Sequence, residues 1–296
     1  MASRRTGPAA WAQDRLLRTL IGALLLLPYE WRVPLCGWVM SRLIAPLAGW
    51  DRRVRDNLAR VMPDLPEAEV RRLMRRVPDN VGRSVIESYS GREFVERAAR
   101  HPVGGPGLAT LEAAHAEGRP VVIVTGHFGN YDASRAALMA RGFRIGGLYR
   151  PMNNRYFNEH YVRAMAAIGE PIFPRGKQGL AGMLRHLRGG GMLGLLIDVH
   201  MRDGAVLQFF GQPAKTALSA AELALKYDAP LVPVYAIRAA NGLDFTIRVG
   251  APIPRGTPSE MTQALNDSLE EIVRDHMDQW FWIHRRWRVP ARASAA

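Results

Sequence analysis

The stretch Val121-Val-Ile-Val-Thr-Gly-His-Phe-Gly-Asn-Tyr-Asp132 decides the fold of this chain. It opens with a continuous run of β-branched residues, which is typical of a strand that is covered on both faces. Gly126 and Gly129 interrupt that run, and helix-forming residues resume at 133–140. The pattern therefore predicts a strand, a tight turn and a helix, with His127 in the turn.

His127 and Asp132 are candidates for a catalytic pair. If the helix begins near Asn130, Asp132 lies in its first turn, where the positive end of the helix dipole favours an ionised carboxylate. We expect Asp132 to accept a hydrogen bond from one imidazole nitrogen of His127, which leaves the other nitrogen free as a general base. The alternative is a purely structural histidine beside a strand end, and the turn alone does not decide between the two.

The rest of the chain alternates strands with helices after residue 120. We expect strands near 121–125, 145–149, 193–197, 231–237 and 244–249, and helices near 130–141, 155–168, 178–188 and 217–227. Residues 52–100 have helical periodicity, and Thr257-Pro-Ser-Glu260 is a capping box that starts a helix to about Met277. The pattern predicts an α/β fold, a mixed central sheet flanked by helices, in one catalytic domain over residues 51–296.

The first 50 residues carry two apolar segments. Residues 20–28 are too few to span a bilayer, which takes about 20 apolar residues, and the second segment, 33–50, contains Arg42. Together they predict an N-terminal helical membrane anchor over residues 1–50, lying in one leaflet as a hairpin. Four arginines precede the first apolar segment, as in a signal peptide: Arg4, Arg5, Arg15 and Arg18. No clear small-x-small cleavage site follows Leu27, which argues against cleavage.

Positive charge dominates the composition. The formal net charge is +13, and of the 40 Lys and Arg residues all but Lys177, Lys215 and Lys226 are arginine. Such a balance favours anionic partners: lipid phosphates, an acidic carrier protein or nucleic acid. We expect no nucleic acid, because zinc-finger spacing and an RRM-like aromatic box are both missing from the sequence. We also expect no metal, because neither H-E-x-x-H nor C-x-x-C spacing occurs.

The box Gly126–Asp132 resembles the H-x-x-x-x-D/E motif of the glycerophosphate and lysophospholipid acyltransferase superfamily. Its form is similar to that of the bacterial lipid A biosynthesis (late, Kdo-dependent) acyltransferases. Further segments that match in order and spacing are 55–63, Tyr149–Asn154, Leu196–His200 and the aromatic and basic run Gln279–Arg288. Phe209–Ala214 with Thr216 resembles the family's small-residue loop that opens a helix. The chain departs from the pattern at Asp132, where those enzymes often carry Glu, and at Val199, where a polar residue is expected.

The resemblance implies a glycerophosphate-acyltransferase-like fold and a membrane-associated enzyme on the cytoplasmic face of the cell inner membrane. Its acyl donor would be an acyl thioester, carried by acyl carrier protein or by coenzyme A, with no other cofactor. Its acceptor would be a hydroxyl of a lipid A precursor. Another lipid acceptor, such as a glycosylated phospholipid or an ornithine-type lipid, and a non-catalytic membrane adaptor remain alternatives.

Acyl transfer to a hydroxyl needs a base, a group that stabilises the oxyanion and a means of holding two substrates together. We assign the base to His127, oriented by Asp132. Because no Ser or Cys lies beside His127, and the single cysteine is the distant Cys36, we expect direct attack without an acyl-enzyme. Candidate substrate-binding or oxyanion residues are Gly129, Asn130, Arg150, Arg175, Lys177 and Asp198. Of these, Arg150, Arg175 and Lys177 have a plain surface role as the alternative.

Overall fold

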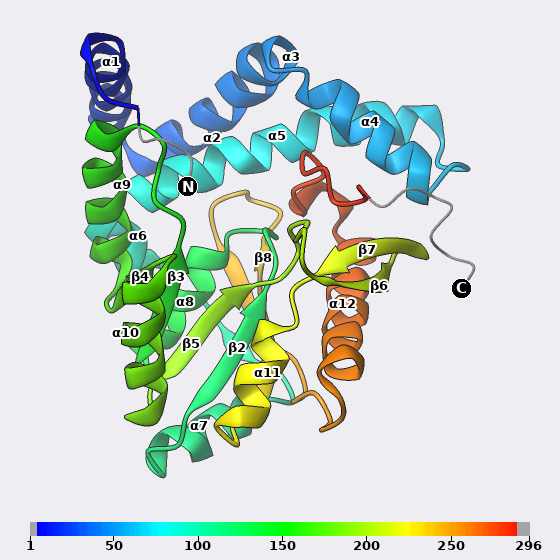
Figure 1. The fold of residues 1–296 in the computed structure, drawn as a ribbon. Coiled ribbons are helices and arrows are strands. Elements are labelled where there is room, and N and C mark those ends of the chain that lie inside the picture. Colours follow the sequence, from blue (N-terminus) through cyan, green and yellow to red (C-terminus); the bar gives the residue numbers. More distant parts are fainter. Residues whose placement is uncertain (1–4, 289–296) are drawn as a thin grey trace.

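A computed structural model describes residues 5–288, so Arg4 lies outside the described residues. Its centre is a seven-stranded sheet in the order β1-β9-β8-β2-β5-β3-β4 (Figure 1). The strands of this sheet are β1 (Val103–Gly104), β2 (Val121–Thr125), β3 (Ile145–Tyr149), β4 (Ile172–Pro174), β5 (Met192–Leu196), β8 (Leu231–Arg238) and β9 (Phe245–Val249). The β2, β3, β4, β5 and β8 strands are parallel, and β9 runs antiparallel to β8. The predicted α/β class with a mixed sheet is confirmed.

Helices cover both faces and one end of this sheet (Figure 1). In chain order they are α1 (Pro8–Leu25), α2 (Tyr29–Val39), the π-helical turn η1 (Met40–Ile44), α3 (Ala45–Leu47), α4 (Trp50–Val61), α5 (Glu67–Tyr89), α6 (Gly91–Ala98), α7 (Leu108–Ala116), α8 (Tyr131–Ala140), α9 (Arg155–Ile168), α10 (Lys177–Arg188), α11 (Ser219–Lys226), α12 (Pro258–Asp275) and the 3₁₀ turn η2 (Met277–Gln279). The predicted capping box is present, since Thr257 and Glu260 cap α12 reciprocally.

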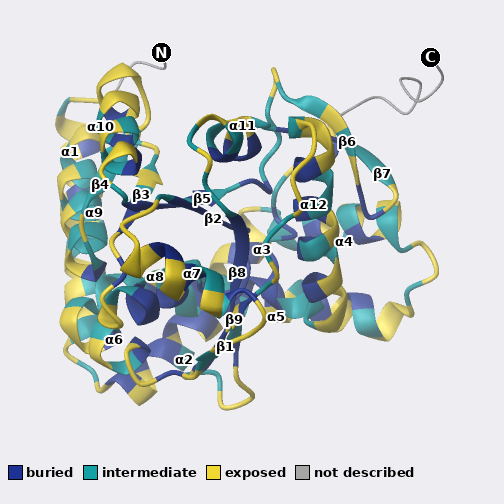
Figure 2. Ribbon diagram, turned by 90° about the horizontal axis from the view of Figure 1, so that it is seen from below, coloured by how far each residue is buried: buried dark blue, intermediate teal, exposed yellow. Residues whose placement is uncertain are grey.

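The β2 strand is buried along its whole length, as Figure 2 shows. Val121 and Ile123 face a core that includes residues of α6, α7 and α8. Val122 and Val124 face the opposite core, which is built from α10, α11 and α12. This two-sided burial explains why every residue of the run is apolar and β-branched.

The hairpin of β6 (Ala205–Phe209) and β7 (Gln212–Thr216) was not predicted. Residues 209–216 were expected to be a loop that opens a helix, but they belong to this antiparallel hairpin. Its turn residues, Phe210 and Gly211, both have positive φ, as a two-residue primed turn requires. An aromatic residue is rarely found in that conformation, so the sequence carries no ordinary turn signal here.

The N-terminal helices pack on the rest of the chain. Asn154, at the start of α9, donates a hydrogen bond to the Ala10 carbonyl of α1. The α2 helix lies directly against α5, where the Gly37 and Gly82 backbones meet. Within residues 5–288, no helix combines the length and the apolar character that crossing a bilayer demands.

Replacing Gly82 with Ala tests the α2–α5 contact. An added Cβ would lie 2.5 Å from the Cys36 carbonyl oxygen and 2.9 Å from Gly37 Cα, both of them backbone atoms. We expect Gly82→Ala to lower the free energy of unfolding by about 1–3 kcal/mol, because overpacking forces the helices apart. The control is Gly22→Ala in α1, where an added Cβ meets nothing within 4 Å. Denaturant titration measures both, and equal stabilities would contradict the contact.

Candidate active site

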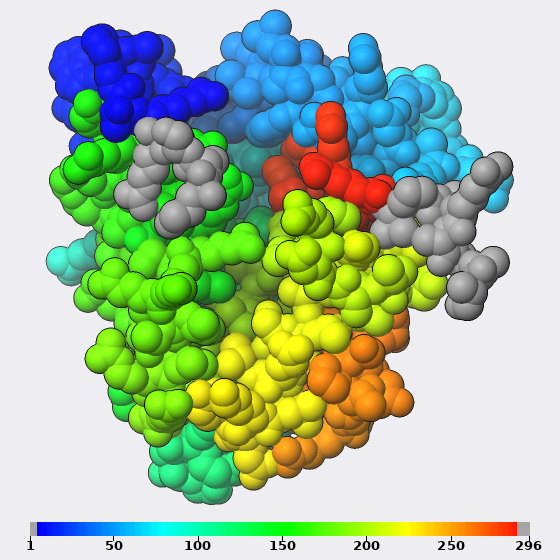
Figure 3. All heavy atoms as spheres, in the orientation of Figure 1, coloured from blue at the N-terminus to red at the C-terminus, as the bar shows by residue number. Residues whose placement is uncertain are grey.

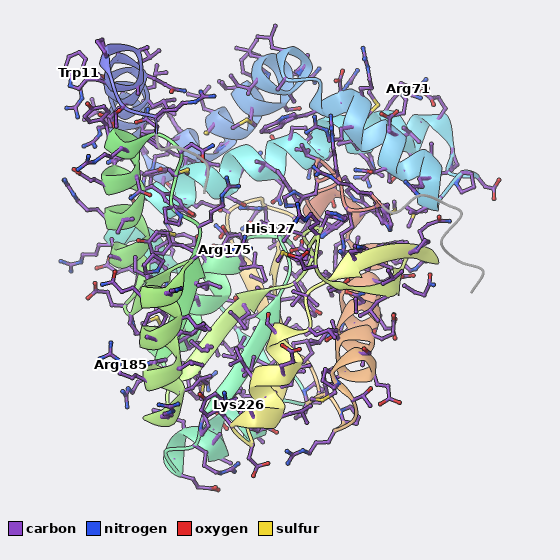
Figure 4. The ribbon with its side chains drawn as sticks, viewed as in Figure 1. Trp11, Arg71, His127, Arg175, Arg185 and Lys226 are labelled. Atoms are coloured by element: carbon purple, nitrogen blue, oxygen red, sulfur yellow. The ribbon has the colours of Figure 1, made fainter. Side chains whose placement is uncertain are left out.

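The predicted site residues gather at one edge of the sheet. His127 follows β2, Arg150 follows β3, Arg175 follows β4 and Asp198 follows β5. These four strands are parallel, so their carboxyl ends share one edge, the usual place for ligands in open α/β sheets. Figure 4 shows His127 and Arg175 at that edge, under the layer of N-terminal helices.

His127 is hydrogen-bonded to Asp198 through both its ring and its backbone. Its Nδ1 atom lies 2.8 Å from Asp198 Oδ1, and its backbone N–H donates to Asp198 Oδ2 at 2.7 Å. An ionised carboxylate only accepts hydrogen bonds, so Nδ1 carries the proton and Nε2 of the neutral ring is unprotonated. Nε2 makes no hydrogen bond to the described residues, and 31% of the side-chain surface stays exposed. The free nitrogen is therefore placed to accept a proton.

This geometry corrects the expectation that Asp132 orients the ring. The β2–β5 register pairs Thr125 with Leu196, so the residues two positions beyond each strand, His127 and Asp198, meet across the sheet. Asp132 lies in the first turn of α8, as predicted, but its Oδ2 accepts a hydrogen bond from Ser88 Oγ at 2.9 Å. A distance of five residues in the sequence is easy to read, whereas a contact across 71 residues depends on strand register.

The charges at this site raise the pKa of His127 and lower that of Asp198. Burial lowers the pKa of His127, but the negative charge and hydrogen bond of Asp198, together with the charge of Asp132, hold that pKa above its ordinary 6.5. Burial raises the pKa of Asp198, but the His127 ring and backbone N–H outweigh it and hold that pKa well below the ordinary range. Burial raises the pKa of Asp132 above 3.8, although Arg135 and Ser88 oppose the rise.

Gly129 and Asn130 hold the turn that carries His127 in place, and their hydrogen-bond donors are not free for a substrate. The Gly129 N–H, expected to stabilise an oxyanion, donates to the Gln279 carbonyl at 2.8 Å. Gly129 has φ of +54°, and a Cβ there would lie 1.8 Å from the Ala236 carbonyl oxygen, so only glycine fits. The Asn130 side chain is buried, caps α8 through Asp132 N–H and donates to Glu87 Oε2 at 2.8 Å. Because their polar groups are engaged, the predicted oxyanion role does not fit either residue.

A buried ion pair holds this loop from behind. Arg238 of β8 contacts both carboxylate oxygens of Glu87 from α5, with Nη2 to Oε2 at 2.7 Å. Glu87 also accepts the hydrogen bond from Asn130, and Arg238 Nε donates to Asn80, whose amide reaches the Gly129 carbonyl at 3.1 Å. Removing one member of such a pair would leave an unpaired buried charge. Sequence reading missed this pair, because 151 residues separate its members.

The C-terminal aromatic and basic segment closes the site. Phe128 and Trp280 form an antiparallel bridge, and the Phe281 N–H donates to the His127 carbonyl at 3.0 Å. The Phe281 and His284 rings lie 6.0 and 4.9 Å from the His127 ring, and Tyr131 lies 5.6 Å from it. The segment 279–284 therefore forms one wall around the imidazole.

The early segment 55–63, which matches the family, contributes to the site through Asn57. The Asn57 side chain donates to the Trp282 and His284 carbonyls at 2.6 and 2.8 Å. Asn57 thus holds the C-terminal segment at the site. In the sequence, segment 55–63 was noticed only through its resemblance to the family.

Arg150, Arg175 and Lys177 are exposed cations at the same edge. Within the described residues their side chains make no contact with His127 or Asp198, and Arg150 Nη2 reaches only Asn153 at 3.4 Å. In Figure 3 the surface is hollowed between the residues that follow β3 and β4, shown in green, and the C-terminal segment, shown in red. Arg150, Arg175 and Lys177 belong to the segments that follow β3 and β4. No cluster of His, Cys, Asp and Glu suited to a metal ion occurs among residues 5–288.

The chain is similar to several known acyltransferases. The phosphatidylinositol mannoside acyltransferase of Mycobacterium tuberculosis is 24% identical over 81% of this chain and 78% of its own length. The one from Mycolicibacterium smegmatis is 23% identical over 81% of this chain and 80% of its own length. A lipid A biosynthesis acyltransferase of Haemophilus influenzae is 23% identical over 60% of this chain and 56% of its own length. The family model described as bacterial lipid A biosynthesis acyltransferase matches residues 8–289, so the chain belongs to this family of acyl-transferring enzymes.

Proposed function

We propose that this enzyme transfers a fatty acyl chain from an acyl thioester to a hydroxyl of a membrane glycolipid, with His127 as the general base. The observation that carries the proposal is the His127–Asp198 hydrogen bond, which leaves Nε2 unprotonated and accessible. We place the reaction at the cytoplasmic face of the inner membrane, where acyl thioesters are available.

The chemistry balances with these two residues. The acceptor hydroxyl attacks the thioester carbonyl carbon, and Nε2 of His127 takes its proton as the new C–O bond forms. Asp198 stabilises the resulting imidazolium through Nδ1–H. When the tetrahedral intermediate collapses, the C–S bond breaks and the imidazolium returns the proton to the thiolate. The products are an ester and a thiol, and no acyl-enzyme forms.

Two lipid acceptors fit this chemistry. The family model and the lipid A acyltransferase favour a lipid A precursor. The mannoside acyltransferases favour a glycosylated phospholipid, and they align over 81% of the chain, against 60% for the lipid A acyltransferase. In either case the exposed Arg150, Arg175 and Lys177 would bind phosphate groups beside the site. We propose acyl carrier protein as the donor, since the basic surface suits an acidic carrier, with acyl coenzyme A as the second candidate.

Mass spectrometry of membrane lipids tests reaction and acceptor together. We expect cells that carry the wild-type chain to contain a lipid heavier by one acyl group, and cells that carry His127→Ala to lack it. His115→Ala serves as the control, because His115 is exposed on α7, which precedes β2 at the opposite edge of the sheet. An increment on lipid A or on a phospholipid identifies the acceptor. An increment that persists in His127→Ala would contradict the assigned base.

The pH profile of kcat/KM provides a second test. His127 acts as a base only when neutral, so activity should rise as pH increases through its pKa. Asp198 raises that pKa above 6.5, so we expect the midpoint of the acid limb to lie above 6.5. A profile that is flat between pH 5 and 8, measured where chemistry limits the rate, would refute the role of His127.

The surface of the N-terminal helices suits contact with a membrane. Large apolar side chains are exposed along the segment from α1 to α3: Trp11, Leu16, Leu20, Leu26, Trp31, Leu35, Trp38, Leu43, Ile44 and Leu47. Figure 4 shows Trp11 pointing away from the body of the protein. Trp31 is 68% and Leu47 is 89% exposed, which is costly in water and favourable at a lipid interface. We propose that these helices lie in the interface.

Vesicle co-sedimentation tests this surface. We expect the triple variant Trp11→Ser, Trp31→Ser, Trp38→Ser to bind anionic phospholipid vesicles at least about tenfold more weakly, since each buried aromatic ring contributes substantially to the free energy of transfer. The matched control replaces Leu180 and Val206 with Ser; they are similarly exposed, at 48% and 49%, but lie on α10 and β6. Equal losses in both variants would contradict a specific interface.

A further inference from the structure

Trp280 contacts the carboxylate of Asp198 as well as packing in the aromatic core. Its indole Nε1–H donates to Asp198 Oδ2 at 2.9 Å. Trp280 is 1% exposed and Asp198 is fully buried, so water does not compete for this contact. In the low dielectric of such a site, a hydrogen bond to a charged acceptor has a large electrostatic effect.

The hydrogen bonds of Asp198 divide between its two oxygens. Oδ1 faces the Nδ1 atom of His127, and Oδ2 accepts from the His127 backbone N–H and from Trp280. Within residues 5–288, Trp280 is thus the only residue other than His127 that donates a hydrogen bond to this carboxylate. The indole therefore adds an external constraint on where the carboxylate lies.

The fold fixes the position of this indole from two sides. The Trp280 backbone forms a bridge with Phe128, the residue directly after His127, so Trp280 is attached to the turn that carries the base. The ring packs edge-on against Trp282 at 4.7 Å and Phe209 at 5.3 Å. These contacts fill the space around Trp280 and hold its N–H toward Asp198.

We propose that Trp280 is a positioning residue whose indole N–H fixes the Asp198 carboxylate against His127 and draws part of its negative charge away from the imidazole. The inference rests on the proposed role of His127 as base. A carboxylate that gives up charge to a second donor attracts the proton of the imidazolium less strongly. Trp280 thereby limits how far Asp198 raises the proton affinity of His127.

Trp280→Phe tests the hydrogen bond, because it removes the N–H and keeps an aromatic ring. Trp287→Phe is the matched control: Trp287 is also buried, but its indole donates to the Phe209 carbonyl at 3.0 Å instead of to Asp198. The readout is the pKa of His127, from NMR titration of its imidazole in the full-length protein, together with the acid limb of kcat/KM. Thermal unfolding of both variants measures the cost of losing an indole.

We expect Trp280→Phe to raise the pKa of His127 by about 0.5 to 1 and to move the acid limb upward by the same amount. We expect Trp287→Phe to lower stability without moving either value. A pKa of His127 in Trp280→Phe that equals that of the control, or lies below it, would overturn the proposal. The NMR titration needs no activity, so it tests Trp280 even if His127→Ala retains activity and the proposed function fails.

A measurement on the unsubstituted enzyme covers the case in which Trp280→Phe does not fold. The indole N–H resonance of Trp280 should shift with the same midpoint as the His127 titration, because both groups share Asp198. The N–H resonance of Trp287, whose indole donates to the Phe209 carbonyl, should stay constant over that range. A Trp280 resonance that ignores the titration would also contradict the proposal.

Discussion

The register between β2 and β5 is the constraint on which the site depends. It pairs Thr125 with Leu196, and two residues further along both strands it places His127 against the buried Asp198. Neither strand can slip without separating the two residues, because each is packed on both faces and a one-residue shift would exchange its buried faces. The sheet therefore does more than support a loop: its hydrogen-bond pattern selects which carboxylate serves the imidazole.

The remaining structure holds the turn that carries His127. Behind the turn, the Asn80 side chain donates to the Gly129 carbonyl and the Asn130 side chain donates to Glu87. Arg238 donates to both Asn80 and Glu87. In front of the turn, the C-terminal segment adds a backbone bridge and the Trp280 indole, and Asn57 of α4 holds that segment in turn. Polar groups buried in this way must be fully paired, so the whole assembly specifies one geometry.

Local patterns in the sequence predicted most of the elements. The β-branched run over 121–124, the Gly-rich turn and the Thr257 capping box are features of neighbouring residues, and each marks the element that the structure contains. The partner of His127 was beyond such reasoning, because Asp132 is near in the sequence whereas Asp198 becomes near only through strand pairing. The roles of Gly129 and Asn130 were misjudged for the same reason: their partners Gln279 and Glu87 come from distant segments. Arg150 directly follows a predicted strand, and the structure has it there; β4, the strand before Arg175, was not predicted.

The central claim is that Asp198, and not Asp132, is hydrogen-bonded to the imidazole of the base. Proton NMR of the Nδ1–H resonance of His127 tests it most directly, in the wild-type enzyme and in the variants Asp198→Asn and Asp132→Asn. The account predicts a far-downfield proton in the wild type and in Asp132→Asn that is lost in Asp198→Asn. Loss of that proton in Asp132→Asn, with its retention in Asp198→Asn, would contradict the account.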